Sequence, residues 1–140
     1  MIRDSARLML RTLRTDLETF DLSITQYLVV RDVLESPGIN QRILSGHINI
    51  AEAALVGVVN ALERRKLLVR KRSANDRRNS QLFLTKEGRA LARKILRRAV
   101  ALNDTACVGF SQAEVDTLRH LLSRMKENLR GANDTNATAG

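Results

Sequence analysis

Most of the chain follows a helical pattern of apolar residues, and only one short stretch alternates. Apolar positions recur at every third or fourth residue, which predicts amphipathic helices over residues 3–20, 23–35, 41–47, 51–66, 85–106 and 111–129. Period-two alternation over 80–84 places Leu82 and Leu84 on one face of a strand and Gln81 and Phe83 on the other. A segment with strand character, 67–72, precedes it. The pattern therefore predicts a mainly α protein with one small β-hairpin.

Capping and turn residues mark the ends of these helices. Residues 23–26 (SITQ) and 111–114 (SQAE) fit the capping box, in which the first and fourth side chains satisfy each other's backbone donors. Pro37 and Gly38 end the second helix, and Asn40 is suited to cap the third. Asn49 tolerates the left-handed backbone that a tight turn needs. Short helix, tight turn, longer helix and hairpin follow one another in the order of a winged helix-turn-helix.

The same spacing predicts which side chains of this unit face the core. The expected inward residues are Ile24, Tyr27 or Leu28, and Leu34 in the second helix, Ile43 and Leu44 in the third, and Ala51, Leu55, Val58, Val59 and Leu62 in the fourth. The opposite face of the fourth helix then carries Glu52, Ala53, Val56, Gly57, Asn60, Glu63 and Arg64.

The charge balance indicates an anionic partner. The 140 residues include 24 Lys and Arg against 15 Asp and Glu, a net charge of +9. Aromatic residues are only 3% of the chain, too few for the stacking platforms of RNA readers and single-strand binders. An acidic membrane surface is disfavoured because no amphipathic helix carries Trp or Phe along its apolar face. Double-stranded DNA is the partner that fits best.

The hairpin concentrates the positive charge. Basic residues on its approach are Arg64, Arg65, Lys66, Arg70, Lys71 and Arg72, and the polar tip over 73–79 carries Asp76, Arg77 and Arg78. A basic hairpin after an amphipathic helix is suited to grip a nucleic-acid backbone. The alternative is a solvated hairpin whose charges only maintain solubility.

The first and last helices carry apolar stripes that a small winged domain does not need. A partner protomer is the simplest place to bury them, and an intramolecular bundle is the alternative. We expect dimerisation helices at 1–22 and 89–130, a winged helix-turn-helix at 23–88, and a disordered tail of small polar residues at 131–140.

At this point the sequence resembles the MarR family of bacterial transcriptional regulators. The carrying motifs are Leu22-Ser23-Ile24-Thr25-Gln26, Asp76-Arg77-Arg78 and the run Leu82-Phe83-Leu84-Thr85-Lys86-Glu87-Gly88. The resemblance implies a homodimer with interlocked terminal helices, with the fourth helix of each protomer in the major groove. It also implies that Arg78 enters the minor groove and that Asp76 holds the wing arginine.

The expected DNA-binding residues lie on the helix-turn-helix and the hairpin. They are Gln41, Arg42, Glu52, Ala53, Val56, Gly57, Asn60, Arg64, Arg70, Lys71, Arg72, Asp76, Arg77 and Arg78. An arginine at a hairpin tip fits a narrow minor groove, and Arg64, Arg70, Lys71, Arg72 and Arg77 would contact phosphates without reading sequence. One departure from the family is that Ala53, Val56 and Gly57 offer base edges at most a contact with thymine methyls. Base readout is therefore expected to be sparse and to depend on Asn60, Arg64, the wing and DNA shape.

Other side chains suggest an effector site and argue against catalysis or metal binding. His47, Tyr27, Arg11 and Arg14 could hold the small phenolic or carboxylate effector that relatives bind, although surface arginines and a core tyrosine explain these residues more simply. Two distant histidines, His47 and His120, do not form a metal site. The lone Cys107 has no neighbouring base and reads as a packed thiol. No cofactor motif, catalytic spacing, signal peptide or membrane span is present, which favours the cytoplasm.

These observations predict a ligand-responsive repressor that binds a pseudo-palindromic operator as a homodimer. The alternative is a winged dimer that acts as a protein-interaction module with weak or shape-only DNA binding. The apolar outer face of the fourth helix is the feature that favours the alternative.

Overall fold

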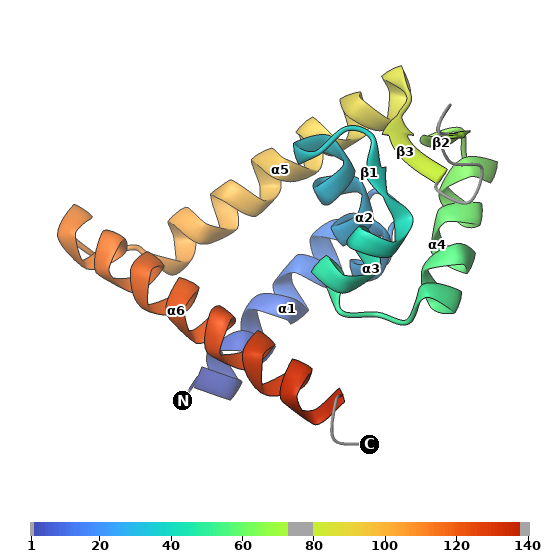
Figure 1. Cartoon of the computed structure of the whole chain (residues 1–140). Helices are drawn as coiled ribbons and strands as arrows, with labels where there is room; N and C mark the ends of the chain where they lie inside the picture. The colour runs from blue at the N-terminus through green and yellow to red at the C-terminus, as the bar shows by residue number, and fades with distance from the viewer. Residues whose placement is uncertain (1, 73–79, 138–140) are drawn as a thin grey trace. The chain divides into compact units, whose positions relative to one another are not determined.

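A computed structural model describes residues 2–72 and 80–137 and confirms the mainly helical fold with a small sheet (Figure 1). In chain order the elements are α1 (Ile2–Glu18), α2 (Ile24–Glu35), β1 (Ile39–Asn40), α3 (Gln41–Ile48), α4 (Glu52–Arg64), β2 (Leu68–Arg72), β3 (Ser80–Leu84), α5 (Lys86–Ala106) and α6 (Gln112–Ala137). The chain divides within α5 into two compact units, Met1–Leu102 and Asn103–Gly140. The first contains the helix-turn-helix and the hairpin, so it positions the candidate site.

The sheet has the antiparallel order β1-β3-β2 within the described residues. Leu68 pairs with Leu84 and Arg70 with Leu82 across the predicted hairpin, and Leu82 and Leu84 are buried as expected. Strand β1 was not predicted, because two residues cannot show a period. It forms because Gly38, at φ +84°, turns the chain so that its N–H donates to the carbonyl of Leu82 at 2.8 Å.

The second helix is buried on more sides than the sequence predicted. Its fully buried apolar residues include Val29, Val30 and Val33, whereas Ile24, Leu28 and Leu34 are only partly buried. Contacts with α1, α3, α4 and β3 explain the difference, because a helix at the centre of a core buries most of its circumference rather than one stripe (Figure 1).

The helix-turn-helix forms largely as predicted. The Asn40 side chain caps α3 by accepting from the Arg42 N–H at 2.7 Å, and Asn49 ends it in the left-handed region at φ 54°. Leu44 is fully buried, but Ile43 is 55% exposed, so its expected core position was wrong. The next two residues, Leu44 and Ser45, take the inward positions instead. In α4 the core residues are Leu55, Val59 and Leu62, with Val58 at the margin and Ala51 exposed.

Side chains cap the starts of the two C-terminal helices, and the cap at Ser111 is the predicted one. Thr85 Oγ1 accepts from the Gly88 N–H at 2.9 Å at the start of α5. At α6 the Ser111 N–H donates to Glu114 at 2.7 Å, and the bonds from Ser111 lower the pKa of the Glu114 carboxyl. The expected disorder over 131–140 was wrong as far as Ala137, because α6 continues to that residue. Extending an existing helix is easier than nucleating one, so small polar residues can prolong it.

Several apolar side chains on the terminal helices are exposed in the single chain. On α1 they include Leu8, Met9 and Leu10, and on α6 Leu118, Leu121, Leu122 and Leu129. Among the described residues, no single helix is both long and apolar enough to cross a bilayer; α3 and α4 reach the apolar length only as a pair bent by 107°.

Candidate nucleic-acid interface

The outward face of α4 is the one that the helical spacing predicted. Glu52, Ala53, Gly57 and Arg64 are exposed, Val56 is 42% exposed, and Asn60 is half-buried. Ala51 makes no side-chain capping bond. Glu52 Oε1 lies 3.9 Å from Nε of the exposed Arg42 of α3. At that distance between exposed side chains the ion pair contributes little stability. The first turn of α4 is anchored in the core by Leu55, which is fully buried.

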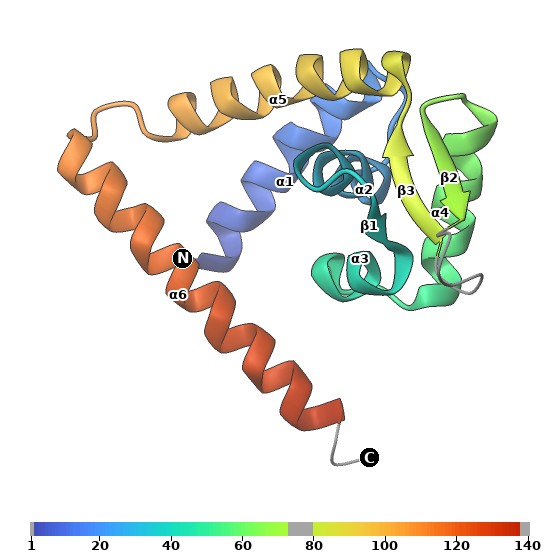
Figure 2. The same cartoon turned by 45° about the horizontal axis from the view of Figure 1, so that its top comes forward.

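The hairpin has an outer face, which carries Val69, Lys71, Gln81 and Phe83, and an inner face that is directed toward α4. Strand β2 contacts α4, and Figure 2 shows the two side by side. On the outer face, the ammonium of Lys71 lies 5.0 Å from the centre of the Phe83 ring, a cation–π contact. Lys71 and Arg72 are both exposed and available to an anionic partner.

Arg70 has a different environment from the one expected. Its guanidinium donates to Glu63 Oε2 through Nη1, to Asn60 Oδ1 through Nη2 at 2.8 Å, and to Gln41 Oε1 through Nε at 3.3 Å. The Arg70 backbone N–H also donates to Glu63 Oε1 at 3.0 Å. We expected Arg70 to contact phosphate, but its side chain is only 26% exposed and is held against α3 and α4. We call Arg70, Glu63, Asn60 and Gln41 the Arg70 cluster.

Sequence reasoning missed Glu63 as a partner, although a signal for it exists. Arg70 lies two residues after the buried Leu68 and opposite the buried Leu82, so strand alternation places it on the inner face. A cation there needs a buried partner, and Glu63 lies on the last turn of the adjacent helix.

The junction below the hairpin depends on two unusual backbone positions. Lys66 has φ +57°, in the left-handed region that favours glycine. Its carbonyl accepts from Thr85 Oγ1 at 2.7 Å, which ties the end of α4 to the start of α5. Gly88 approaches the carbonyl of Leu67 so closely that no side chain fits there. The wing tip residues Asp76, Arg77 and Arg78 lie outside the described residues.

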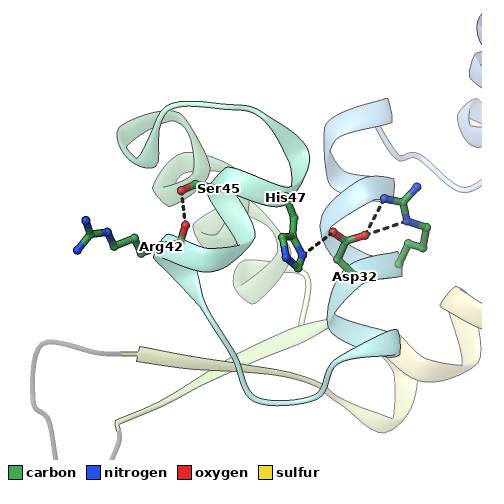
Figure 3. A network of polar contacts seen from close by, with 5 residues as sticks. Asp32, Arg42, Ser45 and His47 are labelled. Carbon is green, nitrogen blue, oxygen red and sulfur yellow. Dashed lines mark hydrogen bonds and ion pairs between the residues drawn. The ribbon is translucent and has the colours of Figure 1, made fainter. Parts of the chain in front are cut away.

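A second polar cluster joins α2 to α3 (Figure 3). Asp32 is 8% exposed; its Oδ1 accepts from Arg31 Nε at 2.9 Å and Nη2 at 2.7 Å, and its Oδ2 lies 3.8 Å from His47 Nδ1. Burial alone would lower the pKa of Arg31, but the hydrogen bond and the charge of Asp32 raise it overall. Figure 3 shows His47 directed at Asp32 while Arg42 extends away from α2. Neither Arg31 nor Asp32 was predicted from the sequence to belong to a site.

Removing this carboxylate should destabilise the fold. We expect Asp32→Ala to lower the free energy of unfolding by about 2 kcal/mol, because Arg31 would lose a charge-assisted partner while half-buried. Glu35→Ala removes the same charge from an exposed position of α2 and should change stability by less than about 0.5 kcal/mol. Urea unfolding followed by circular dichroism measures both, and equal midpoints would contradict the structural role of Asp32.

The predicted effector residues are only partly brought together. Tyr27 is buried, and its ring lies 5.9 Å from the Arg31 guanidinium carbon, so it joins the cluster that contains His47. Arg11 and Arg14 are exposed side chains of α1. Their role as effector ligands stays a prediction.

The chain is similar to known proteins over most of its length. Residues 22–80 match the MarR family. The homoprotocatechuate degradative operon repressor of Escherichia coli is 29% identical over 102 residues, covering 73% of this chain and 69% of that protein.

Solved structures extend the similarity to the whole fold. A MarR family transcriptional regulator from Listeria monocytogenes, in complex with a 26-mer DNA, superposes with a TM-score of 0.86 at 27% identity, covering 94% of this chain and 89% of that one. CouR from Rhodococcus jostii RHA1, bound to p-coumaroyl-CoA, superposes with a TM-score of 0.79 at 27% identity, covering 89% and 87%.

Proposed function

We propose that the chain is a regulator of the MarR type: a ligand-responsive transcriptional repressor that binds a pseudo-palindromic DNA operator as a homodimer. The observation that carries the proposal is the helix-turn-helix with its exposed α4 face and basic hairpin alongside. A net charge of +9 supplies the electrostatic attraction for duplex DNA. The Listeria relative of the same fold binds a DNA 26-mer, which supports the assignment.

Direct base reading by α4 is limited by its composition. Its exposed Ala53, Val56 and Gly57 carry no hydrogen-bonding side-chain groups, so they offer at most apolar contact with thymine methyls. Glu52 can only accept hydrogen bonds, from the amino group of cytosine or adenine. Specificity then depends on Asn60, Arg64, the wing and the deformability of the operator.

The exposed apolar residues of α1 and α6 support a homodimer. A chain that left all of them in water would carry an apolar surface of the kind that marks interaction sites. An interface between two copies buries each stripe against its counterpart, as closed two-fold symmetry requires.

A small aromatic acid or its thioester is the proposed effector class. The CouR structure holds p-coumaroyl-CoA, and the repressor from E. coli is named for homoprotocatechuate degradation. Tyr27, His47, Arg11 and Arg14 remain the candidate contacts. Effector binding would change the distance between the two α4 helices of the dimer and so lower its affinity for the operator. We propose no catalytic role and a cytoplasmic location, where the operator would be found.

Selection of bound sequences from a random duplex pool at about 150 mM salt tests the function. An inverted repeat with half-sites about one helical turn apart would support a dimeric operator-binding regulator. Absence of an enriched motif, or binding that follows A·T content alone, would favour the protein-interaction module.

The wing arginine has its own test. Arg78→Ala should weaken operator binding by roughly 1–3 kcal/mol, because an arginine in the minor groove would be lost. Arg97→Ala removes the same charge from an exposed position of α5 and should leave affinity within about twofold. Titration of a labelled operator measures both, and equal affinities would remove the wing from the proposed interface.

A further inference from the structure

We propose that Arg70 is a specificity-determining residue: it turns the amides of Asn60 and Gln41 so that both offer only N–H donors to DNA, and Asn60 therefore reads guanine. This inference rests on the proposed function, since it concerns which base a DNA-reading α4 selects. It assigns Arg70 a role other than phosphate contact.

The amide orientation follows from the chemistry of the partner. A guanidinium has hydrogen-bond donors and no acceptor, so any amide bonded to it must present its oxygen. Arg70 meets Asn60 Oδ1 at 2.8 Å and Gln41 Oε1 at 3.3 Å, which fixes the carbonyl ends of both amides inward. The amide nitrogens lie at the opposite ends and remain as donors.

The other acceptor in this region is also occupied. Both carboxylate oxygens of Glu63 accept from Arg70, one from the backbone N–H and one from the guanidinium. Asn60 lies four residues from Val56 and from Arg64, so it shares their exposed stripe of α4. The C-terminal half of this face therefore presents the Asn60 amide nitrogen and the Arg64 guanidinium, both donors.

An asparagine that offers DNA only N–H donors cannot form the usual bidentate pair with adenine. The bidentate asparagine–adenine pair needs the amide oxygen for the adenine N6 amino group and the amide nitrogen for N7. Because its oxygen is turned inward toward Arg70 and away from the groove, Asn60 retains only the second bond. Guanine offers two adjacent acceptors, N7 and O6, and no major-groove donor, so it is the complementary base.

Only an arginine can hold this arrangement. Three partners on two helices receive bonds from Nε, Nη1 and Nη2, in the three directions of a rigid planar fork. Lys71, the next residue along β2, is exposed on the outer face and provides the matched control.

The test compares selected duplex pools for the wild type, Asn60→Ala, Arg70→Ala and Lys71→Ala, all as full chains. The position at which Asn60→Ala loses its preference identifies the base pair read by Asn60. We expect this pair to be G·C in the wild type and in Lys71→Ala. In Arg70→Ala the freed oxygen should shift the preference toward A·T by about tenfold.

Salt titration separates the two basic residues. Lys71→Ala should reduce the slope of log affinity against log salt by about one, as expected for a lost phosphate contact, whereas Arg70→Ala should leave the slope unchanged. A fall of the slope in Arg70→Ala equal to that in Lys71→Ala would overturn the inference.

The remaining outcomes are also decisive. An A·T pair at the Asn60-dependent position, or no change in Asn60→Ala, would overturn the inference and leave the proposed function standing. Absence of any wild-type motif would overturn both. If Arg70→Ala does not fold, the comparison of wild type with Asn60→Ala still decides, because G·C supports the assignment and A·T refutes it.

Discussion

Gly88→Ala should destabilise the winged domain by about 3 kcal/mol or more, an effect larger than most single substitutions produce. A methyl group at this position would lie 1.9 Å from the carbonyl oxygen of Leu67 and 2.9 Å from its carbonyl carbon. Both are backbone atoms, and the same oxygen accepts from the Thr85 N–H at 3.1 Å. The clash can be relieved only by separating α5 from the base of the hairpin, which would also displace the wing.

Gly46 provides the matched control. It lies within α3, and a methyl group there would meet no atom within 4 Å. Gly46→Ala should therefore stabilise the protein by about 0.5–1 kcal/mol through helix propensity. The urea concentration at the unfolding midpoint measures the stability change of each variant, provided that the slope of unfolding free energy against urea concentration is unchanged. Similar midpoints for the two would show that the close approach at Gly88 is not tight in solution.

Lysine at both Leu118 and Leu122 should convert the homodimer into monomers. These leucines share one stripe of α6 with Met125 and Leu129, and both are exposed in the single chain. If this stripe forms the dimer interface, the double substitution removes two apolar side chains per protomer from the interface. It also adds two positive charges that face those of the partner. The dissociation constant should rise at least about a hundredfold.

His120→Lys with Ser123→Lys is the control for this pair. It adds the same number of positive charges to exposed positions on the opposite half of α6. Sedimentation velocity should show monomers for the leucine variant and dimers for the control. Dimers in both double variants would exclude this stripe of α6 from the dimer interface. Monomers in both would indicate that added charge alone separates the protomers.

The candidate site was predictable from the sequence wherever a feature depends on the periodicity of a single helix or strand. Helical spacing alone gave the outward face of α4, from Glu52 to Arg64, and strand alternation gave the buried Leu82 and Leu84. The environment of Arg70 was not predicted, because its charge suggested phosphate contact. Its partner Gln41 is 29 residues away in sequence.

The sequence by itself determined the local structure: helix starts at Asn40 and Ser111, the left-handed Asn49, and the hairpin. The helix starts and the left-handed turn depend on hydrogen bonds or steric limits among residues at most a few positions apart, and the hairpin follows from the alternation within β3. The tertiary structure alone decided the all-round burial of α2, the pairing of β1 with β3, the burial of Asp32 and the contact of Gly88 with Leu67. These contacts join segments distant along the chain, and a periodic pattern carries no information about which distant segment will cover a given face.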